Sequence, residues 1–146
     1  MKRIFFLTGI LIAGILVQLS AEIWLPALFA DHMIVQRDAT TSLWGKADAN
    51  KRVTVVTSWN LKRYTTTSDA DGNWKLSINT PKAGGPHTIM ITDGKPLTLN
   101  NVMSGEVWLC SGQSNMEMTM KGYSSQPVEG SAMHILKSGN KNIRVF

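Results

Sequence analysis

The sequence predicts a mainly β chain, a β-sandwich followed by the first strand, turn and helix of an α/β fold. Three observations support this class. Short segments rich in Val, Thr, Tyr and Trp recur at regular spacing over residues 33–102, separated by Gly, Asp, Asn and Pro. An unbroken apolar run follows at Val107–Cys110, and then a small polar turn and helix-forming residues. The 146 residues are enough for one medium-sized domain, or for a small domain and part of another.

The strongest strand signal lies in the middle of the first region. Trp74, Leu76 and Ile78 alternate with polar residues, so this strand should bury one face. The preceding segment Asp69–Asn73 has the composition of a turn. We therefore predict that the three apolar side chains, including the indole of Trp74, belong to the core.

The other strand signals are weaker but evenly spaced. Arg52–Trp59 alternates except at Val56, and Lys62–Thr67 should pair with it. Asp93-Gly94 predicts a two-residue hairpin, and Pro96 predicts that the returning strand is an edge strand or starts late. We expect seven or eight strands, for which a sandwich is the simplest closed arrangement; the remaining ones are Met33–Val35, Thr41–Trp44, His87–Thr92 and Leu97–Leu99.

The amino terminus has the pattern of a secretory signal. Lys2 and Arg3 precede an apolar core, Ile4–Val17, and small residues then favour cleavage after Ala21. An uncleaved anchor is the alternative, but the apolar core is shorter than the ~20 residues of a spanning helix. We expect a secreted or periplasmic protein with residues 1–21 removed and no membrane segment in the mature form. Loss of Lys2 and Arg3 lowers the formal net charge from +5 to +3, which gives little support to nucleic-acid binding.

The segment after residue 106 predicts a strand, a tight turn and a helix. Val107–Cys110 suits a strand buried on both faces, and helix-forming residues run from Met116 until Gly122. A hydroxyl in such a turn can act as a nucleophile, and the free N–H groups of the helix can hold an oxyanion. By spacing alone, Ser114 and Glu117 also fit a helix capping box, and Ser111 is a second candidate hydroxyl.

The motif Gly112-Gln113-Ser114-Asn115-Met116, preceded by Glu106–Ser111, resembles the first motif of the sialate O-acetylesterases, in the SGNH (GDSL-like) hydrolase superfamily. The resemblance implies that Ser114 is the nucleophile and that Gly112, Gln113 and Asn115 support the oxyanion site, with Gln113 where many relatives carry Asp. Three more segments resemble the amino-terminal β-domain of that family: 25–29, 69–74 and 83–87.

The resemblance also implies a reaction and a division into domains. The enzyme would remove O-acetyl groups from sialic acids or other acetylated glycans without a metal or organic cofactor. Its base would be a His, carried with an Asp near a distant carboxyl terminus. We expect a signal peptide at 1–21, a β-sandwich at 22–102 and the start of an SGNH domain at 103–146. One strand and one helix cannot cover a parallel sheet, so we expect a truncated chain that is inactive alone.

The remaining reactive side chains have simpler interpretations. Cys110 is the only cysteine, so no intramolecular disulfide can form, and its apolar neighbours predict a buried, inert thiol. His32 and His87 are expected on the surface or in packing contacts of the β-sandwich, and His134 follows Ser114 at the wrong place for the base. Glu106 and Glu117 are better explained by a turn and by the cap than by glycosidase chemistry; the three histidines lack zinc-site spacing.

Two other functions stay open. The β-sandwich could be a non-catalytic carbohydrate-binding or scaffold module, because exposed tryptophans can stack on sugar rings, and Trp59 is the candidate least explained by the core. Alternatively, the chain could belong to an acetyl esterase that acts on plant polysaccharide.

Overall fold

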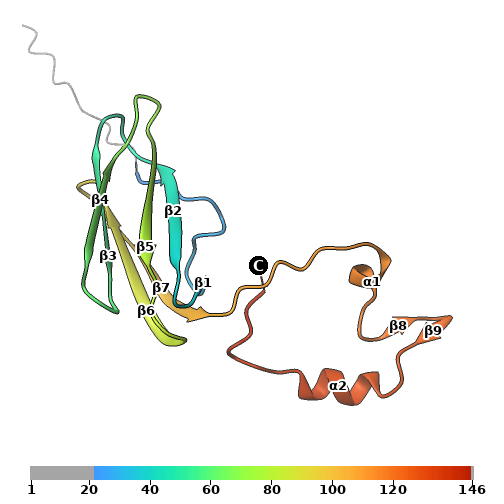
Figure 1. The fold of residues 1–146 in the computed structure, drawn as a ribbon. Coiled ribbons are helices and arrows are strands. Elements are labelled where there is room, and N and C mark those ends of the chain that lie inside the picture. Colours follow the sequence, from blue (N-terminus) through green and yellow to red (C-terminus); the bar gives the residue numbers. More distant parts are fainter. Residues whose placement is uncertain (1–21, 146) are drawn as a thin grey trace, which may run out of the picture.

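A computed structural model describes residues 22–145 of the chain. Seven strands form a β-body, and a tail with two short helices and a small hairpin follows (Figure 1). The strands of the β-body are β1 (Ile34–Gln36), β2 (Thr40–Lys46), β3 (Arg52–Thr57), β4 (Arg63–Thr67), β5 (Asn73–Asn79), β6 (Gly84–Thr92) and β7 (Pro96–Gly105). The tail contains α1 (Ser114–Glu117), β8 (Gly122–Tyr123), β9 (Gln126–Pro127) and α2 (Ser131–Lys137).

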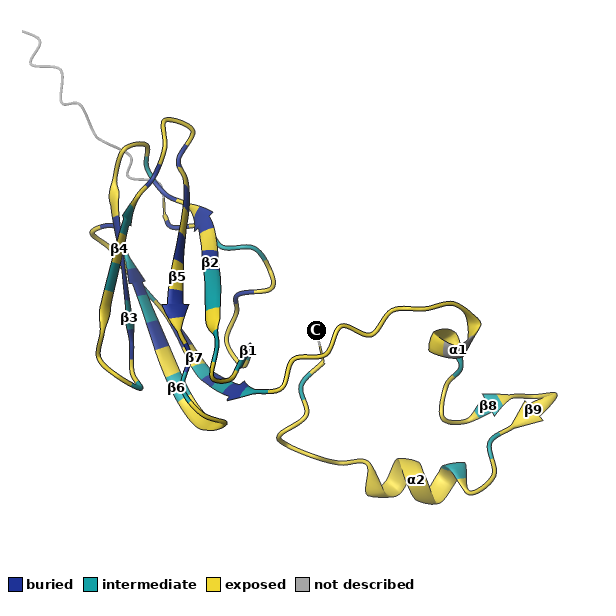
Figure 2. Ribbon diagram, viewed as in Figure 1, coloured by how far each residue is buried: buried dark blue, intermediate teal, exposed yellow. Residues whose placement is uncertain are grey.

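The strands of the β-body make two sheets. The larger sheet has the order β1-β7-β6-β3-β4, and β2 pairs with β5 in the smaller one. All pairings are antiparallel except that of β1 with β7, which is parallel. Figure 2 shows the buried residues concentrated in these strands, while the tail is almost wholly exposed. The predicted mainly β class is confirmed.

Side chains from both sheets share one core. Strand β5 buries every second residue, as its alternation predicts, and it pairs with β2 over its whole length. Because two paired strands are marginally stable alone, the β2–β5 ladder depends on burying this face against the larger sheet. The fully buried aliphatic side chains come from five strands: Leu43, Val53, Val55, Ile78, Ile89, Ile91 and Val102.

Gly45 lets the small sheet and the amino-terminal segment approach closely. A Cβ at Gly45 would lie 2.3 Å from the carbonyl oxygen of Trp24 and 3.2 Å from the indole of Trp74. The backbone of Trp24 forms two hydrogen bonds with Lys46, both 2.9 Å long. Any side chain at residue 45 would therefore push apart the segment that covers the core and the buried indole, which is 3% exposed.

One polar turn leads into β5 as the sequence predicts. The Oδ1 atom of Asp69 accepts the N–H groups of Asp71 and Asn73 at 2.9 and 2.8 Å. The side-chain amide of Asn73 is the largest cause of a lowered pKa at Asp69. Gly72 takes a positive φ of 81°, which closes the turn. The predicted turn between Asp69 and Asn73 is confirmed.

The structure corrects several predicted strand limits. Strand β6 begins at Gly84 rather than at His87, and three residues, not two, connect it to β7. Strand β7 is not an edge strand, because it lies between β6 and β1. However, β1 pairs only with the end of β7, so Pro96 meets no strand on that side. This is why a proline is tolerated there.

One prediction on the tail is wrong, and the prediction of a signal sequence is not tested. Residues 107–110 form no strand, and within residues 22–145 no strand pairs with this segment. The proposed signal sequence lies outside the described residues. Within residues 22–145, no helix is long and apolar enough to cross a membrane.

Truncating the side chain of Ile78 should destabilise the β-body. Its side chain is fully buried between the sheets, so Ile78→Ala should lower the free energy of unfolding by about 3 kcal/mol, through lost burial and a cavity. Urea denaturation followed by tryptophan fluorescence measures this. Lys75→Ala, on the exposed face of the same strand, is the control and should change stability by less than about 0.5 kcal/mol; equal losses for both variants would contradict a shared core.

Candidate active site

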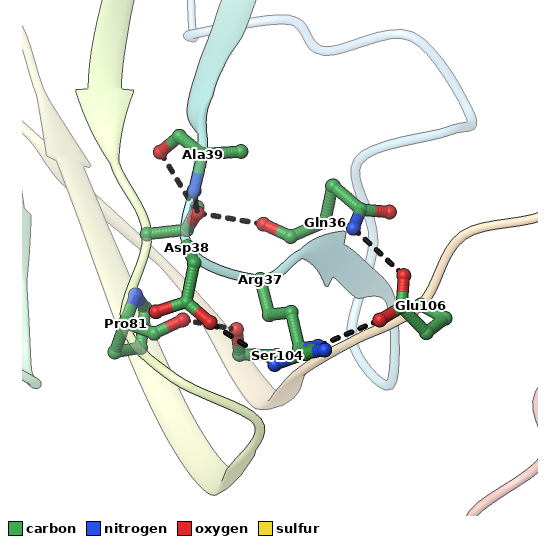
Figure 3. A network of polar contacts seen from close by, with 8 residues as sticks. Gln36, Arg37, Asp38, Ala39, Pro81, Ser104 and Glu106 are labelled. Atoms are coloured by element: carbon green, nitrogen blue, oxygen red, sulfur yellow. Dashed lines mark hydrogen bonds and ion pairs between the residues drawn. The ribbon is translucent and has the colours of Figure 1, made fainter.

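The tail leaves the β-body through a polar network at the ends of β1 and β7. Figure 3 shows Glu106 held by two side chains of the β1 end. Gln36 donates from Nε2 to Glu106 Oε2 at 2.9 Å, and Arg37 donates from Nε to Glu106 Oε1 at 2.6 Å. Gln36 Oε1 also accepts the N–H of Val107 at 2.9 Å. These contacts set the direction in which the chain departs toward Ser114.

The charges of this network stabilise one another. The hydrogen bond from Gln36, and next the one from Arg37, lowers the pKa of Glu106. In turn, the hydrogen bond and charge of Glu106, with a smaller effect of Asp38, raise the pKa of Arg37. Both partners are about half exposed, so solvent weakens the ion pair. The sequence predicts only a turn at Glu106. It does not predict the contacts with Gln36 and Arg37, because these residues are distant in sequence.

The apolar run after Glu106 is exposed. Val107, Trp108 and Leu109 are 50%, 82% and 96% exposed, and Cys110 is exposed as well. The predicted buried strand and the predicted buried thiol are both wrong. The physical reason is that an apolar run is buried only when other elements cover it, and no sheet covers this run within the described residues.

Ser114 opens helix α1 and is exposed. Gln113, not Ser114, occupies the N-cap position, and no side chain caps the helix. The predicted capping box with Glu117 is therefore wrong. The hydroxyl of Ser114 forms no hydrogen bond to any residue that the structure describes. Capping therefore does not account for this serine.

The residues around Ser114 form a single helical turn rather than the longer helix that the sequence predicts. Met116 N–H donates to Gln113 O at 2.8 Å, and Met118 N–H donates to Ser114 O at 3.1 Å. A Cβ at Gly112 would lie 2.6 Å from Cγ of Met116, so glycine lets that side chain fold over the turn. Gln113 is exposed, and the side chain of Asn115 lies outside what the structure describes.

The histidines do not contact Ser114. His32 lies in the β-body with its Nδ1 atom 2.7 Å from Nδ2 of Asn101, and His87 packs edge-on against Trp59 with ring centroids 5.3 Å apart. His134 is exposed on α2, which Figure 1 shows well away from α1. None of the three forms a hydrogen bond with the nucleophile candidate, and no group of acidic, His or Cys side chains suited to a metal occurs in residues 22–145.

Arg144 joins the end of the tail to the β-body, a contact that the sequence did not reveal. Its Nη1 atom donates to the carbonyl oxygens of His32, at 2.7 Å, Met33, at 3.1 Å, and Asn101, while Nη2 donates to Asn101 Oδ1 at 3.0 Å. His32 and Asn101 have positive φ values of 68° and 54°, which help to bring these carbonyls together. No periodicity in the sequence predicts this cluster of carbonyl oxygens around a guanidinium, because most of its acceptors are backbone atoms. The clamp returns the end of the tail to the β-body.

Comparisons with known proteins show which class of enzymes this chain resembles. No family model matches the sequence. A crystal structure of a carbohydrate acetylesterase from Xanthomonas citri matches with a TM-score of 0.62 and 37% identity, over 68% of this chain and 22% of that one. The chain is thus related to carbohydrate esterases.

Curated relatives make the relationship more specific. The sialate O-acetylesterase of Rattus norvegicus is 32% identical over 100 residues, covering 62% of this chain and 18% of that protein. The human sialate O-acetylesterase is also 32% identical, over 62% of this chain and 19% of that protein. The predicted resemblance to this family is confirmed. The chain spans about a fifth of the length of these relatives.

The Glu106 network should make stability depend on pH in one direction. The pKa of Glu106 is lowered on folding, so its stabilising effect is full above the ordinary glutamate value, about 4.3, and disappears as the pH falls through the lowered value. Glu106→Gln should therefore be less stable than the parent at pH about 7, and the two should converge at acidic pH, once Glu106 is protonated in the folded state as well. Urea denaturation across this range tests the prediction; a difference that grows on acidification would contradict it, and Glu129→Gln serves as the exposed control.

Loss of the Arg144 clamp should loosen the tail without unfolding the β-body. Helix α2 has no buried residue, and so short a helix is marginal alone. Arg144→Ala should raise amide hydrogen-exchange rates in α2 by about tenfold, while β3 and β6 exchange as before. Lys141→Ala, an exposed neighbour, should change neither rate. Unchanged exchange in Arg144→Ala would show that the guanidinium does not hold the tail.

Proposed function

We propose that this chain is the amino-terminal part of an exported serine esterase that removes O-acetyl groups from sialic acids. The observation that carries the proposal is the exposed, uncapped Ser114 in the Gly112–Met116 motif. The related carbohydrate and sialate acetylesterases support the reaction class. Export rests on the signal pattern of residues 1–21.

The proposed reaction is acyl transfer through an acyl-enzyme. Ser114 Oγ attacks the acetyl carbonyl carbon, its proton passes to a base, and the carbonyl oxygen becomes an oxyanion. The ester bond to the sugar then breaks, the sugar oxygen takes up the proton, and water hydrolyses the acetyl-serine. In the first turn of α1, the N–H groups of Ser114 and Asn115 have no partner within the helix. They are the proposed oxyanion donors, with Gly112 and Gln113 shaping the turn.

The base and its acidic partner are proposed to come from residues beyond this chain. No His of the described residues contacts Ser114, and the family resemblance implies a His and an Asp far along the sequence. The 146-residue chain should therefore show negligible hydrolysis of an acetyl ester. The proposed domain limits, 22–102 for the β-sandwich and 103–146 for the start of the SGNH domain, belong to the same interpretation.

Acetylated plant polysaccharide is an alternative substrate for the same serine. The Xanthomonas citri relative is a carbohydrate acetylesterase, which leaves the sugar open. Release of acetate from O-acetylated sialic acid and from acetylated xylan, measured side by side, separates the two substrates. A strong preference for xylan would replace sialic acid in the proposal and leave the role of Ser114 intact.

Ser114→Ala in the full-length protein should reduce kcat for acetyl-ester hydrolysis about a thousandfold or more, because the nucleophile is lost. Acetate release measures the rate, and circular dichroism checks the fold. Ser111→Ala removes the neighbouring hydroxyl and should retain most of the activity. If Ser111→Ala were the inactive variant and Ser114→Ala the active one, the assignment of the nucleophile would be wrong.

A further inference from the structure

An open groove lies on the β-body where the small sheet meets the end of β4 and the turn at Asp69. Its volume is about 660 Å³, within the range of sites that bind small ligands. Trp24 and Trp44 line it and remain 56% and 40% exposed. Large exposed indoles in one groove are uncommon on a surface with no binding role, so the groove needs a functional explanation.

The register of the strands places polar groups beside the two indoles. Trp44 pairs with Lys75, and Lys46 pairs with both Asn73 and Trp24. Cross-strand partners point to the same face of a sheet, as do residues two apart on one strand. The outer face of the small sheet therefore contributes two indoles, two ammonium groups and one amide to the groove, and Thr66, Thr67 and Asp69 line its other side.

The indoles are held in place before any ligand arrives. Trp44 packs edge-on against Phe29, with ring centroids 4.6 Å apart and planes at 80°. The backbone of Trp24 is fixed by its two hydrogen bonds to Lys46. Trp74 lies against Gly45 and also lines the groove, and its Nε1 donor has no partner among the described residues. Preorganised aromatic groups lose little entropy on binding.

The groove lining carries two ammonium groups, those of Lys46 and Lys75, against one carboxylate, that of Asp69. Neither Lys46 nor Lys75 forms an ion pair with a carboxylate in the part of the chain that the structure describes. Lys46 has only a longer-range attraction to Asp69. The Asp69 carboxylate is already occupied by hydrogen bonds from Asn73 and two backbone N–H groups. The two ammonium groups are therefore available to a carboxylate.

We propose that this groove is a second, non-catalytic site that binds a glycan carrying an acidic sugar. A pyranose ring stacks on Trp44 and Trp24, the sugar carboxylate binds Lys46 and Lys75, and a hydroxyl accepts from Asn73. Trp59, the candidate from sequence, does not take part, because its Nε1 atom donates to the carbonyl of Asn79 at 2.9 Å and its ring packs against the core. The site lies on the β-body, whereas Ser114 lies on α1 in the tail, so the proposed binding does not involve the chemistry of Ser114.

A titration with two matched oligosaccharides tests the site. Full-length protein carrying Ser114→Ala is titrated with 3′-sialyllactose and with lactose, which differ by the acidic sugar alone, and calorimetry and tryptophan fluorescence report binding. Neither probe carries an O-acetyl group, so the result does not depend on the esterase. Sialyllactose should bind saturably, at least about tenfold more tightly than lactose, and about 1 M NaCl should weaken it.

Variants then assign the binding to the groove. Trp44→Ala should weaken sialyllactose binding about tenfold or more, and Lys46→Gln with Lys75→Gln should remove its advantage over lactose. Trp108→Ala, an 82% exposed indole outside the groove, is the control and should bind as the parent does. Equal affinity for both sugars, loss of binding in Trp108→Ala alone, or no binding at all would overturn the proposal. Acrylamide quenching of tryptophan fluorescence without sugar is a further test. If the indoles of Trp24 and Trp44 were shielded from acrylamide, the protein itself would fill the groove, and the proposal would be overturned.

Discussion

The structure depends on one hydrophobic core shared between a two-stranded ladder and a five-stranded sheet. Neither sheet can bury its apolar face alone, and the two-stranded ladder of β2 and β5 is too small to be stable without the five-stranded sheet. Burial of the inner face of β5, from Trp74 to Ile78, therefore fixes its outer face as well. Because side chains alternate, the same pairing that hides these residues exposes Trp44, Lys75 and their neighbours in an ordered row.

The tail is held by a different kind of force. Its helices bury almost nothing, and polar contacts near its two ends join it to the β-body: the Glu106 network at the start and the Arg144 clamp near residue 144. Polar contacts are directional, so they can set the course of a chain without a core. They are also weaker where solvent reaches them.

The two proposed sites differ in what supports them. The groove beside the small sheet is built mainly on strands whose inner faces are buried, and Trp44 is held in it by its contact with Phe29. Ser114 lies on one turn of helix in an exposed segment, and its oxyanion donors and base are not assembled among the described residues. A nucleophile needs both to react. The proposed binding groove is therefore assembled within the described residues, whereas the proposed catalytic centre is not.

Sequence alone determined the mainly β class, the alternating core of β5, the pairing of β3 with β4 and the turn at Asp69, because these depend on neighbours in the chain and on a period of two. It also singled out Ser114 through a local motif. Tertiary structure decided the rest. The run Val107–Cys110 is exposed because no element covers it within the described residues. Contacts between segments distant in sequence decide the partners of Glu106, the carbonyl clamp on Arg144 and the placement of Trp24 and Trp44 in one groove. Such contacts leave no period in the sequence, and they follow from which surfaces the packed sheets cover and which they leave open.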